Sequence, residues 1–327
     1  MNYLGSKKTL TTFIIENIEK QTCLPISSLV ICDAFGGVGE VSKALLLKGV
    51  KLLHVNDIES YSHVLLKQFL NGVNSKRYID LTFELNSEIP KDFGLISEHF
   101  SPFGKEKRAY FTIKNAQKID FIRQNIEEKL ERKEIFEDEY NALLASLIFA
   151  SDKVANTISM YGAYLKEFKF TAKQDLLLEP IKTLQGEVIH HNLDANVLIK
   201  KISGDVLYLD PPYNHRQYGL NYHLLNTIVN YKEFTPKGKS GFGEYIRSSW
   251  ASKKHVLRVF EEMIKNANFK WVFLSYNNEG LMSEVDIQKI MQKYGKYERV
   301  FTLKDKLRMQ KVKKSTTKEF LHVLKKD

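Results

Sequence analysis

Residues 29–39 read Leu-Val-Ile-Cys-Asp-Ala-Phe-Gly-Gly-Val-Gly, a short apolar run that leads into a glycine-rich turn. The run has the length and composition of a buried strand, and residues 40–48 then carry apolar side chains at helical spacing. A second strand-like run at 51–57 is followed by another helical pattern at 60–70. This stretch therefore predicts a β-α-β-α unit, with which a doubly wound α/β sheet begins.

The alternation of strands and helices stops after about residue 72 and resumes near residue 186. Residues 116–140 are highly charged with a helical pattern, and residues 141–155 are more apolar. Strand-like runs return at 188–191, 205–209 and 271–276, and a hairpin-like pair follows at 297–303 and 319–324. We expect a core domain of residues 1–74 and 186–327, with a mostly helical insertion at 75–185.

The composition is that of an ordinary globular protein with a surplus of positive charge. Of 327 residues, 43% are hydrophobic and 27% charged, and 49 Lys+Arg against 39 Asp+Glu give a net charge of +10. These values argue against disorder, collagen-like structure and a coiled-coil rod. A basic chain with 12% aromatic residues suits a nucleic-acid partner, although many basic proteins bind none.

The two cysteines, Cys23 and Cys32, are too few for a disulfide framework or a four-thiolate zinc site and fit a reducing compartment. No apolar run approaches the length of a membrane span, and no basic-then-apolar leader opens the chain. We expect a cytoplasmic protein that has no membrane partner and no metal. The adjacent His190 and His191 would point to opposite faces of a strand, and no ligand pattern accompanies them.

The glycine-rich turn predicts a nucleotide-like ligand. Gly36, Gly37 and Gly39 would let the backbone approach a ligand closely and would direct helix-start amides toward it. Asp57, at the end of the second strand, could accept hydrogen bonds from two ribose hydroxyls. Ser42 stands where a dinucleotide fingerprint has its third glycine, which counts against NAD. The alternative is a glycine turn that binds no ligand.

A second motif, Asp210-Pro211-Pro212-Tyr213, follows a strand-like run. The prolines stiffen the chain and leave carbonyl groups as acceptors. The Asp210 carboxylate and the Pro211 carbonyl could accept the two hydrogens of an adenine amino group and stabilise its transition state. Tyr213 would offer a face on which an extrahelical base can stack. The alternative is a rigid turn between a strand and a loop.

Four motifs in this order resemble the D12 class of DNA adenine-N6 methyltransferases, the Dam-like, alpha-group enzymes that use S-adenosylmethionine. They are residues 3–7 (Tyr-Leu-Gly-Ser-Lys), 33–39, 210–213 and 275–280 (Ser-Tyr-Asn-Asn-Glu-Gly), and residues 214–223 strengthen the match to the restriction-modification branch. The resemblance implies a Rossmann-like methyltransferase sheet that ends in an antiparallel hairpin. It also implies that the 75–185 insertion is the target-recognition region.

The resemblance assigns the cofactor-binding residues position by position. Tyr3, Gly5 and Lys7 would border the methionine end of S-adenosylmethionine, and Asp33, Phe35, Gly36, Gly37 and Gly39 would form its floor. Asp57 would hold the ribose and Asp194 the adenine amino group. An aspartate at position 194 is also an ordinary helix N-cap.

Candidate contacts to double-stranded DNA lie in three places. A basic, aromatic loop, which is either solvated or in contact with DNA, contains Lys105, Arg108 and Tyr110. The terminal hairpin would contact phosphates through Lys311, Lys313 and Lys314. The flipped base or its neighbours would face His215, Arg216, Gln217 and Tyr218. Which side chains of the insertion and of the 214–252 loop reach base edges is not predicted, and neither is the recognition sequence.

The sequence thus predicts an S-adenosylmethionine-dependent DNA adenine-N6 methyltransferase, the modification enzyme of a restriction system with a possible cognate endonuclease. We expect a monomer or a weak dimer. The alternatives are an enzyme for cytosine N4 or for adenine in RNA on the same fold, and a catalytically silent nucleic-acid-binding module. Aspartate before Pro-Pro-Tyr favours adenine. A binding module would need neither Asp210-Tyr213 nor the glycine turn.

Overall fold

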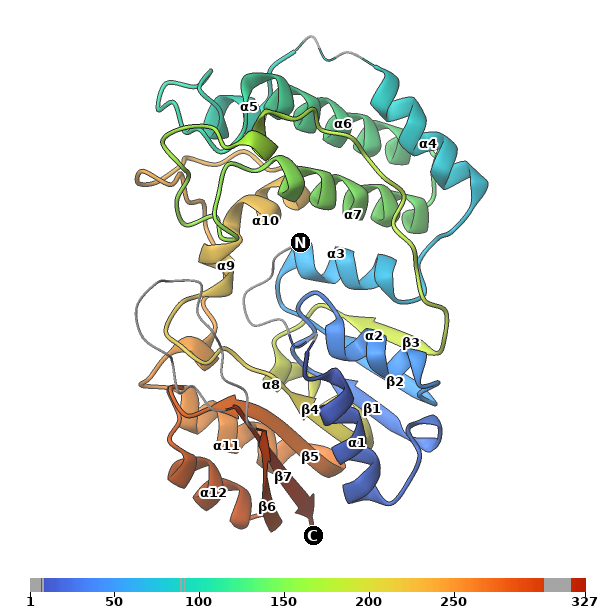
Figure 1. Ribbon diagram of the computed structural model, residues 1–327, viewed down its shortest axis with the longest axis vertical. Helices are drawn as coiled ribbons and strands as arrows, with labels where there is room; N and C mark the ends of the chain where they lie inside the picture. Colours follow the sequence, from blue (N-terminus) through green and yellow to red (C-terminus); the bar gives the residue numbers. More distant parts are fainter. Residues whose placement is uncertain (1–6, 8, 89, 91, 303–318) are drawn as a thin grey trace. The chain divides into compact units, whose positions relative to one another are not determined.

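This computed structural model describes residues 7, 9–88, 90, 92–302 and 319–327. The described chain contains a seven-stranded sheet (Figure 1). The strand order is β3-β2-β1-β4-β5-β7-β6. The strands are β1 (Val30–Asp33), β2 (Leu52–Asn56), β3 (Val188–His191), β4 (Ser203–Leu209), β5 (Asn268–Asn277), β6 (Gly295–Thr302) and β7 (Glu319–Lys326). β1 to β5 are parallel, whereas β7 runs antiparallel to β5 and β6. The predicted α/β fold with a terminal antiparallel hairpin is confirmed.

Short helices cover this sheet: α1 (Thr11–Thr22), α2 (Glu40–Leu47), α8 (Ala195–Leu198), α11 (Val256–Asn266) and α12 (Glu284–Gln292), with 3-10 turns η1 (Ile26–Ser28) and η3 (Ser249–Ala251). One buried cluster joins β1, β4 and β5 to α8, α11 and α12 and includes Cys32. α11 shows why it packs there: Val256, Val259, Phe260, Met263 and Ile264 recur at helical spacing and are buried.

A second group of helices surrounds α7 (Glu137–Val154). The others are α3 (Ser60–Phe69), α4 (Lys76–Ser87), α5 (Leu95–Phe100), α6 (Ile113–Glu131), α9 (Tyr218–Asn221) and α10 (His223–Asn230), with the 3-10 turn η2 (Phe170–Lys173). α7 packs against α3, α4, α6 and α10, and residues 142–148 are buried on every side. A helix that is apolar all round belongs in a core, as the apolar 141–155 pattern indicates.

The charged stretch 116–140 is divided between α6 and the start of α7. Lys133 has a left-handed φ of 59°, which ends α6, and the carboxylate of Glu139 accepts the Phe136 amide hydrogen at 3.1 Å. That bond satisfies an amide at the beginning of α7. The charged pattern alone gives no sign of this turn.

Asparagine side chains fix the irregular segment that follows α7. Asn156 is fully buried; its amide donates to Ala109 O and Leu165 O, both at 3.0 Å, and accepts the Lys169 amide hydrogen at 3.0 Å. Asn115 bridges residues 172–176 in the same way. Buried backbone groups outside helices and strands need such partners.

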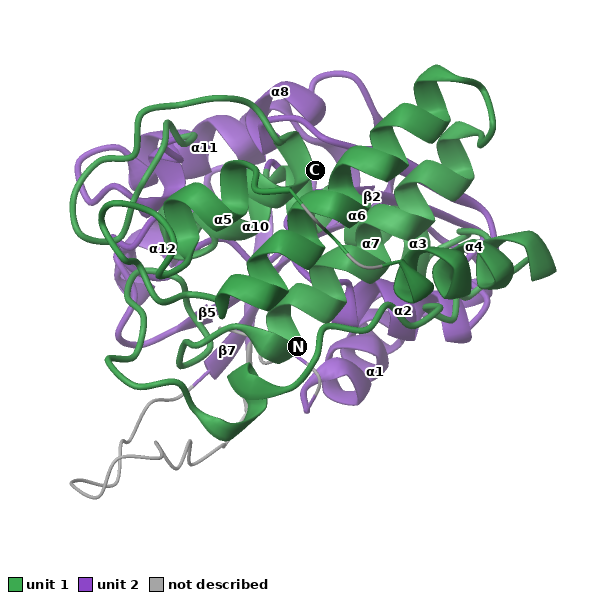
Figure 2. Cartoon of the chain, turned by 90° about the horizontal axis from the view of Figure 1, so that it is seen from above, with its two compact units in different colours: residues 1–6, 59–185, 218–246 green, residues 7–58, 186–217, 247–327 purple. Residues whose placement is uncertain are grey.

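The described residues form two compact units (Figure 2). The sheet unit contains 7–58, 186–217 and 247–327, and the helical unit contains 59–185 and 218–246. The helical unit thus includes α3, α9 and α10 in addition to most of the 75–185 segment. The catalytic and recognition roles of the predicted segments stay predictions.

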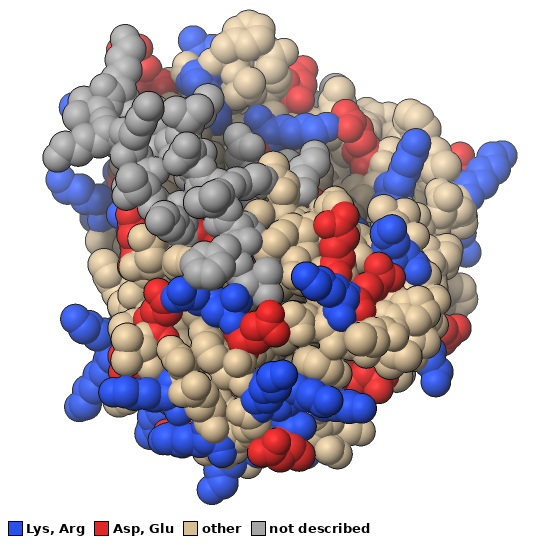
Figure 3. Space-filling model, turned by 60° about the horizontal axis from the view of Figure 1, so that its bottom comes forward, with Lys and Arg blue, Asp and Glu red and all other residues tan. Residues whose placement is uncertain are grey.

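Charged side chains of both signs cover the face in Figure 3, where lysines and arginines occur in several separate groups among aspartates and glutamates. Among the described helices, none has the length and hydrophobicity needed to cross a bilayer.

Candidate active site

The candidate site lies in the sheet unit, at the carboxyl ends of its central parallel strands. β1 ends at Asp33 and β4 at Leu209, directly before Asp210. Asp33 pairs with Tyr208 in the register between β1 and β4, and the Ala34 amide donates to Tyr208 O at 3.1 Å. Ligands of open α/β sheets bind at this edge.

The glycine turn after β1 is joined to the end of β2. Gly37 and Gly39 have φ of 53° and 78°, a left-handed conformation that favours glycine. Gly39 immediately precedes α2, and the Gly37 amide donates to Asp57 Oδ2 at 2.8 Å. A carboxylate has acceptor capacity beyond one such bond. The structure therefore brings the predicted turn and Asp57 together.

Asp33 is 1% exposed and only half satisfied. Its Oδ2 accepts the Ser42 hydroxyl hydrogen at 2.6 Å, whereas its Oδ1 has no hydrogen-bond partner among the described residues. Burial raises the pKa of Asp33 to about 7, although the Ser42 hydrogen bond opposes this. A buried, unpaired carboxylate oxygen is suited to receive a cationic or hydrogen-bond-donating ligand.

Lys7, Asp210 and Tyr213 form a tight cluster in which Lys7 is buried and the other two side chains are partly buried. Lys7 is 4% exposed, and its Nζ lies 2.9 Å from Asp210 Oδ1 and 2.5 Å from the Tyr213 hydroxyl. The Tyr213 hydroxyl donates to the same Oδ1 at 2.7 Å. Burial alone would lower the pKa of Lys7, but the charge of Asp210 raises it well above its usual range. Burial raises the pKa of Asp210, and Lys7 opposes that rise.

The Tyr213 ring is held from behind by the end of β5. It packs edge-on against Tyr276, with ring centroids 4.9 Å apart and planes at 66°. Tyr213 O accepts the Leu281 amide hydrogen at 2.9 Å, and the Tyr276 hydroxyl accepts that of Met282 at 3.2 Å. The 275–280 motif thus supports the aromatic ring of the 210–213 motif.

Trp250 is a site residue that the sequence analysis missed. It is 2% exposed, and its ring meets Phe35 at 5.1 Å and 76°. Its indole N–H donates to Asn196 Oδ1 at 2.9 Å, on α8. Trp250 therefore joins the predicted cofactor floor to the helix that follows Asp194. The available signal was one tryptophan in a polar loop, which no motif marks.

Asp194 is the N-cap of α8. Its Oδ1 accepts amide hydrogens from Asn196 at 2.8 Å and Val197 at 3.3 Å. The ordinary capping role is thus present, and a contact to a cofactor stays a prediction.

Comparison with known proteins decides the family. The model of the D12 class N6 adenine-specific DNA methyltransferases matches residues 3–290. The chain belongs to this class. It is 44% identical over 333 residues to the type II methyltransferase M.NlaIII of Neisseria lactamica, covering 100% of this chain and 99% of that protein.

Two further relatives carry related names. M.CviAII, a type II methyltransferase of Paramecium bursaria Chlorella virus 1, is 37% identical over 91% of this chain and 90% of its own. The type II methyltransferase M.FokI of Planomicrobium okeanokoites is 34% identical over 90% of this chain and 47% of its own. The predicted family is confirmed, and the chain is a DNA methyltransferase.

The three residues predicted to contact DNA in the 105–110 loop differ in burial. Lys105 is exposed. Arg108 is 5% exposed and donates to Lys239 O at 3.1 Å and Gly238 O at 3.2 Å. Tyr110 is fully buried, with its hydroxyl 2.8 Å from Tyr161 O. Arg108 and Tyr110 thus hold loops of the helical unit together, and their predicted DNA contacts do not fit their burial.

The residues after Tyr213 also differ in their surroundings. His215 and Arg216 are exposed. Gln217 pairs with the Ser248 backbone: its Nε2 donates to Ser248 O at 3.2 Å, and its Oε1 accepts the Ser248 amide hydrogen at 2.8 Å. Tyr218 begins α9 and stacks on Tyr222. Tyr3, Gly5, Lys311, Lys313 and Lys314 lie outside the described residues.

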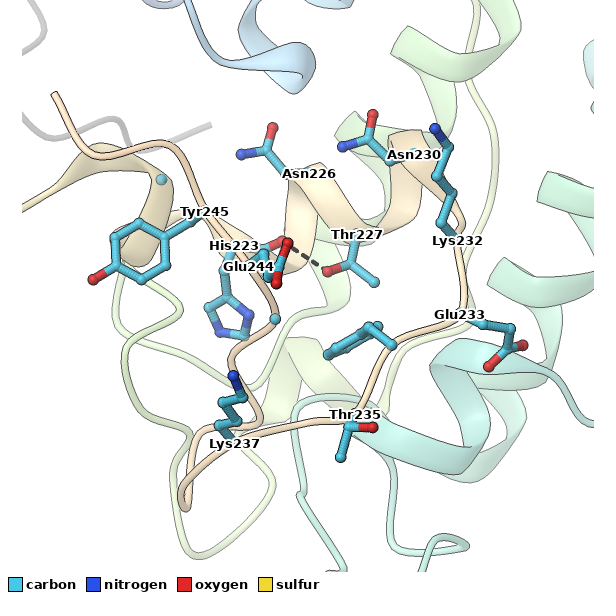
Figure 4. A pocket seen from close by; sticks show the side chains of 13 residues that line it. His223, Asn226, Thr227, Asn230, Lys232, Glu233, Thr235, Lys237, Glu244 and Tyr245 are labelled. Atoms are coloured by element: carbon cyan, nitrogen blue, oxygen red, sulfur yellow. Dashed lines mark hydrogen bonds between the residues drawn. The ribbon is translucent and has the colours of Figure 1, made fainter.

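A separate pocket of about 670 Å³ lies within the helical unit, between α10 and the loop that follows it. Figure 4 shows Asn226 and Asn230 extending from α10, with Lys232 and Thr235 on the loop. Lysines and glutamates both line this pocket, so its charge does not favour phosphate. It belongs to the 214–252 segment.

Replacing Lys7 with methionine should destabilise the protein in a pH-dependent way. At about pH 8 the partly buried Asp210 carboxylate loses its partner, which should lower the free energy of unfolding by about 2–3 kcal/mol. Without Lys7 the folded-state pKa of Asp210 lies still further above its unfolded value, so the loss should shrink toward about pH 5. Denaturant unfolding at both pH values measures this. In an Asp210→Asn background Lys7→Met should cost less; an equal cost in both backgrounds would contradict the pairing.

Arg108→Met should affect folding and leave the electrostatics of DNA binding unchanged. Loss of the buried bonds to Gly238 and Lys239 should lower the free energy of unfolding by about 2–3 kcal/mol. The salt dependence of DNA binding should keep its slope, since each lost phosphate contact would reduce that slope by about 0.9. The control is Lys105→Met at an exposed position, which should not alter stability. A reduced slope for Arg108→Met would restore this residue as a phosphate contact.

Proposed function

We propose that this D12 methyltransferase transfers a methyl group from S-adenosylmethionine to N6 of an adenine flipped out of double-stranded DNA. We further propose that it is the modification enzyme of a restriction system, acting in the cytoplasm beside a cognate endonuclease. The observation that carries the proposal is a pair of carboxylates at the ends of neighbouring parallel strands: Asp33, which is buried, and Asp210, which is partly buried and paired with Lys7. M.NlaIII, M.CviAII and M.FokI are each named as type II methyltransferases, which supports the proposed place in a restriction system.

The residues at the glycine turn fit S-adenosylmethionine. The unpaired Asp33 Oδ1 would accept from the α-ammonium group, and Asp57, already anchored to Gly37, would accept from the ribose hydroxyls. Phe35, supported by Trp250, would lie against the cofactor, and Asp194 would accept from its adenine amino group. When bound, the cofactor supplies a methyl group activated by its attachment to a sulfonium.

The Asp210-Tyr213 segment would prepare the target amino group. Lys7 favours the ionised form of Asp210, and an ionised carboxylate is a hydrogen-bond acceptor only. Because Lys7 and Tyr213 already donate to Oδ1, the adenine amino group would donate to Oδ2 and to the Pro211 carbonyl. Both bonds would strengthen as the nitrogen gains positive charge. The nitrogen then loses one proton, which the Asp210 carboxylate can accept.

Tyr213 would provide the stacking surface for the flipped base. Its hydroxyl is fixed by Asp210 and its ring by Tyr276, so the ring is oriented before a base arrives. A preoriented ring loses little freedom on binding. Pro212 limits the backbone freedom between the acceptor and the stacking surface.

Labelled methyl transfer to duplex DNA and to RNA, with nucleoside analysis of the product, tests the proposal. We expect N6-methyladenine in double-stranded DNA. N4-methylcytosine or labelled RNA would assign another acceptor, and no transfer to any substrate would identify a binding module.

Asp210→Asn should reduce methyl transfer at least about 1,000-fold while cofactor affinity changes little, because Lys7 and Tyr213 would hold the asparagine oxygen at the Oδ1 position and leave an NH2 group where the target amino group needs an acceptor. Single-turnover transfer and calorimetric cofactor titration measure the two effects. Asp205→Asn is the matched control: Asp205 lies on the same strand and accepts the Val30 amide hydrogen at 2.8 Å. That variant should retain transfer. An active Asp210→Asn enzyme would contradict the assigned role.

Cofactor affinity should rise with pH between about pH 5.5 and 7, where an α-amino group keeps most of its protons. The pKa of Asp33 is raised to about 7, so this carboxyl is largely neutral at the lower pH and cannot pair with an ammonium group. Calorimetric titration across this range measures the effect. Asp33→Asn should bind more weakly and with little pH dependence, and a pH-independent affinity of the unmodified enzyme would refute the assignment.

A further inference from the structure

Asn56 is a buried polar residue at the centre of the candidate cofactor site, and neither the motifs nor the proposed mechanism uses it. It is the last residue of β2, it directly precedes Asp57, and it is 1% exposed. A polar side chain buried so completely needs a full set of hydrogen bonds.

The side chain of Asn56 makes three hydrogen bonds, all within the sheet unit. Its Nδ2 donates to Ala34 O at 3.1 Å and to Leu193 O at 3.0 Å. Its Oδ1 accepts the Leu193 amide hydrogen at 3.0 Å. Two carbonyls on one side and an amide hydrogen on the other fix the orientation of the side-chain amide.

These partners belong to the loops that carry the predicted cofactor contacts. Ala34 lies between Asp33 and Phe35, and Leu193 directly precedes Asp194. The backbone carbonyl of Asn56 also accepts the Gly36 amide hydrogen at 2.7 Å. One residue therefore links the ends of β1 and β2 to the turn between β3 and α8.

We propose that Asn56 is a positioning residue for the cofactor: it sets the spacing of Asp33, Asp57 and Asp194 without touching the ligand. This inference rests on the proposed use of S-adenosylmethionine. Three carboxylates from three separate loops can contact one ligand only at fixed positions. If the free protein does not hold them there, binding itself must order the loops, which costs affinity. The buried side-chain amide of Asn56 holds these loops in position in the free protein.

Asn56→Asp is the sharpest change because it preserves the shape of the side chain. The introduced carboxylate can still accept from the Leu193 amide, but it places an oxygen where Nδ2 donated to two carbonyls. We expect cofactor affinity to fall by about tenfold or more. The loss relative to the unmodified enzyme should be smaller at lower pH, where the protonated carboxyl can again donate one hydrogen bond.

Asn156→Asp is the matched control. Asn156 lies in the helical unit, is equally buried, and also donates to two carbonyls and accepts one amide hydrogen. Both variants should lose thermal stability, but only Asn56→Asp should lose cofactor affinity. Calorimetric titration of S-adenosylmethionine into full-length protein, without DNA, measures this affinity.

Kinetics separate positioning from a general loss of structure. For Asn56→Asp we expect KM for the cofactor to rise about tenfold, while kcat at saturating cofactor and Kd for duplex DNA stay within about twofold. A lower kcat with unchanged KM and unchanged cofactor affinity would overturn the inference. If the unmodified enzyme itself bound no S-adenosylmethionine, the proposed function would fail. Normal binding by both the unmodified enzyme and Asn56→Asp would refute the positioning role alone.

Discussion

The ion pair between the buried Lys7 and the partly buried Asp210 constrains the whole candidate site. Its Nζ and Oδ1 atoms are 2.9 Å apart, and the Tyr213 hydroxyl bonds to both. An unpaired charge on the buried Lys7 would be strongly destabilising, so Lys7 requires Asp210. Because Asp210 follows β4 and Lys7 precedes α1, the pair fixes the first helix region against the strand that carries the Asp210-Tyr213 segment. The hydrogen bonds of this cluster also position the Tyr213 ring, which packs against Tyr276.

Features encoded locally were predictable from the sequence. Gly37 and Gly39 must occupy left-handed conformations, and a strand followed by such a turn and a helix has few other interpretations. The more apolar composition of residues 141–155 was also visible in the sequence, and residues 142–148 of α7 are buried. Asp57 follows the second strand and the glycine turn follows the first, so parallel pairing of the two strands places them side by side. The hydrogen bond from the Gly37 amide to Asp57 agrees with this arrangement.

Features that depend on pairing between distant segments were not predictable. Tyr213 and Lys7 lie 206 positions apart, and no local pattern shows that they meet. Arg108 was a candidate DNA contact because it lies in a basic, aromatic loop, yet its guanidinium group donates to the Gly238 carbonyl, 130 positions away. Trp250 was missed for the same reason: its importance derives from Phe35 and Asn196, neither of which is near it in sequence.

The different surroundings of Asp33 and Asp210 explain how two neighbouring carboxylates can serve different ligands. Asp210 has a cation beside it, which favours the ionised form and leaves an acceptor for a neutral amino group. Among the described side chains, the Ser42 hydroxyl is the hydrogen-bond partner of Asp33, and burial raises the pKa of Asp33 to about 7. It is therefore the carboxylate that gains most from an incoming cation. Exchanging the two surroundings would leave the cofactor without an unpaired acceptor and the target amino group facing a carboxyl group with no lysine beside it. The division of roles thus depends on where the fold places a single lysine.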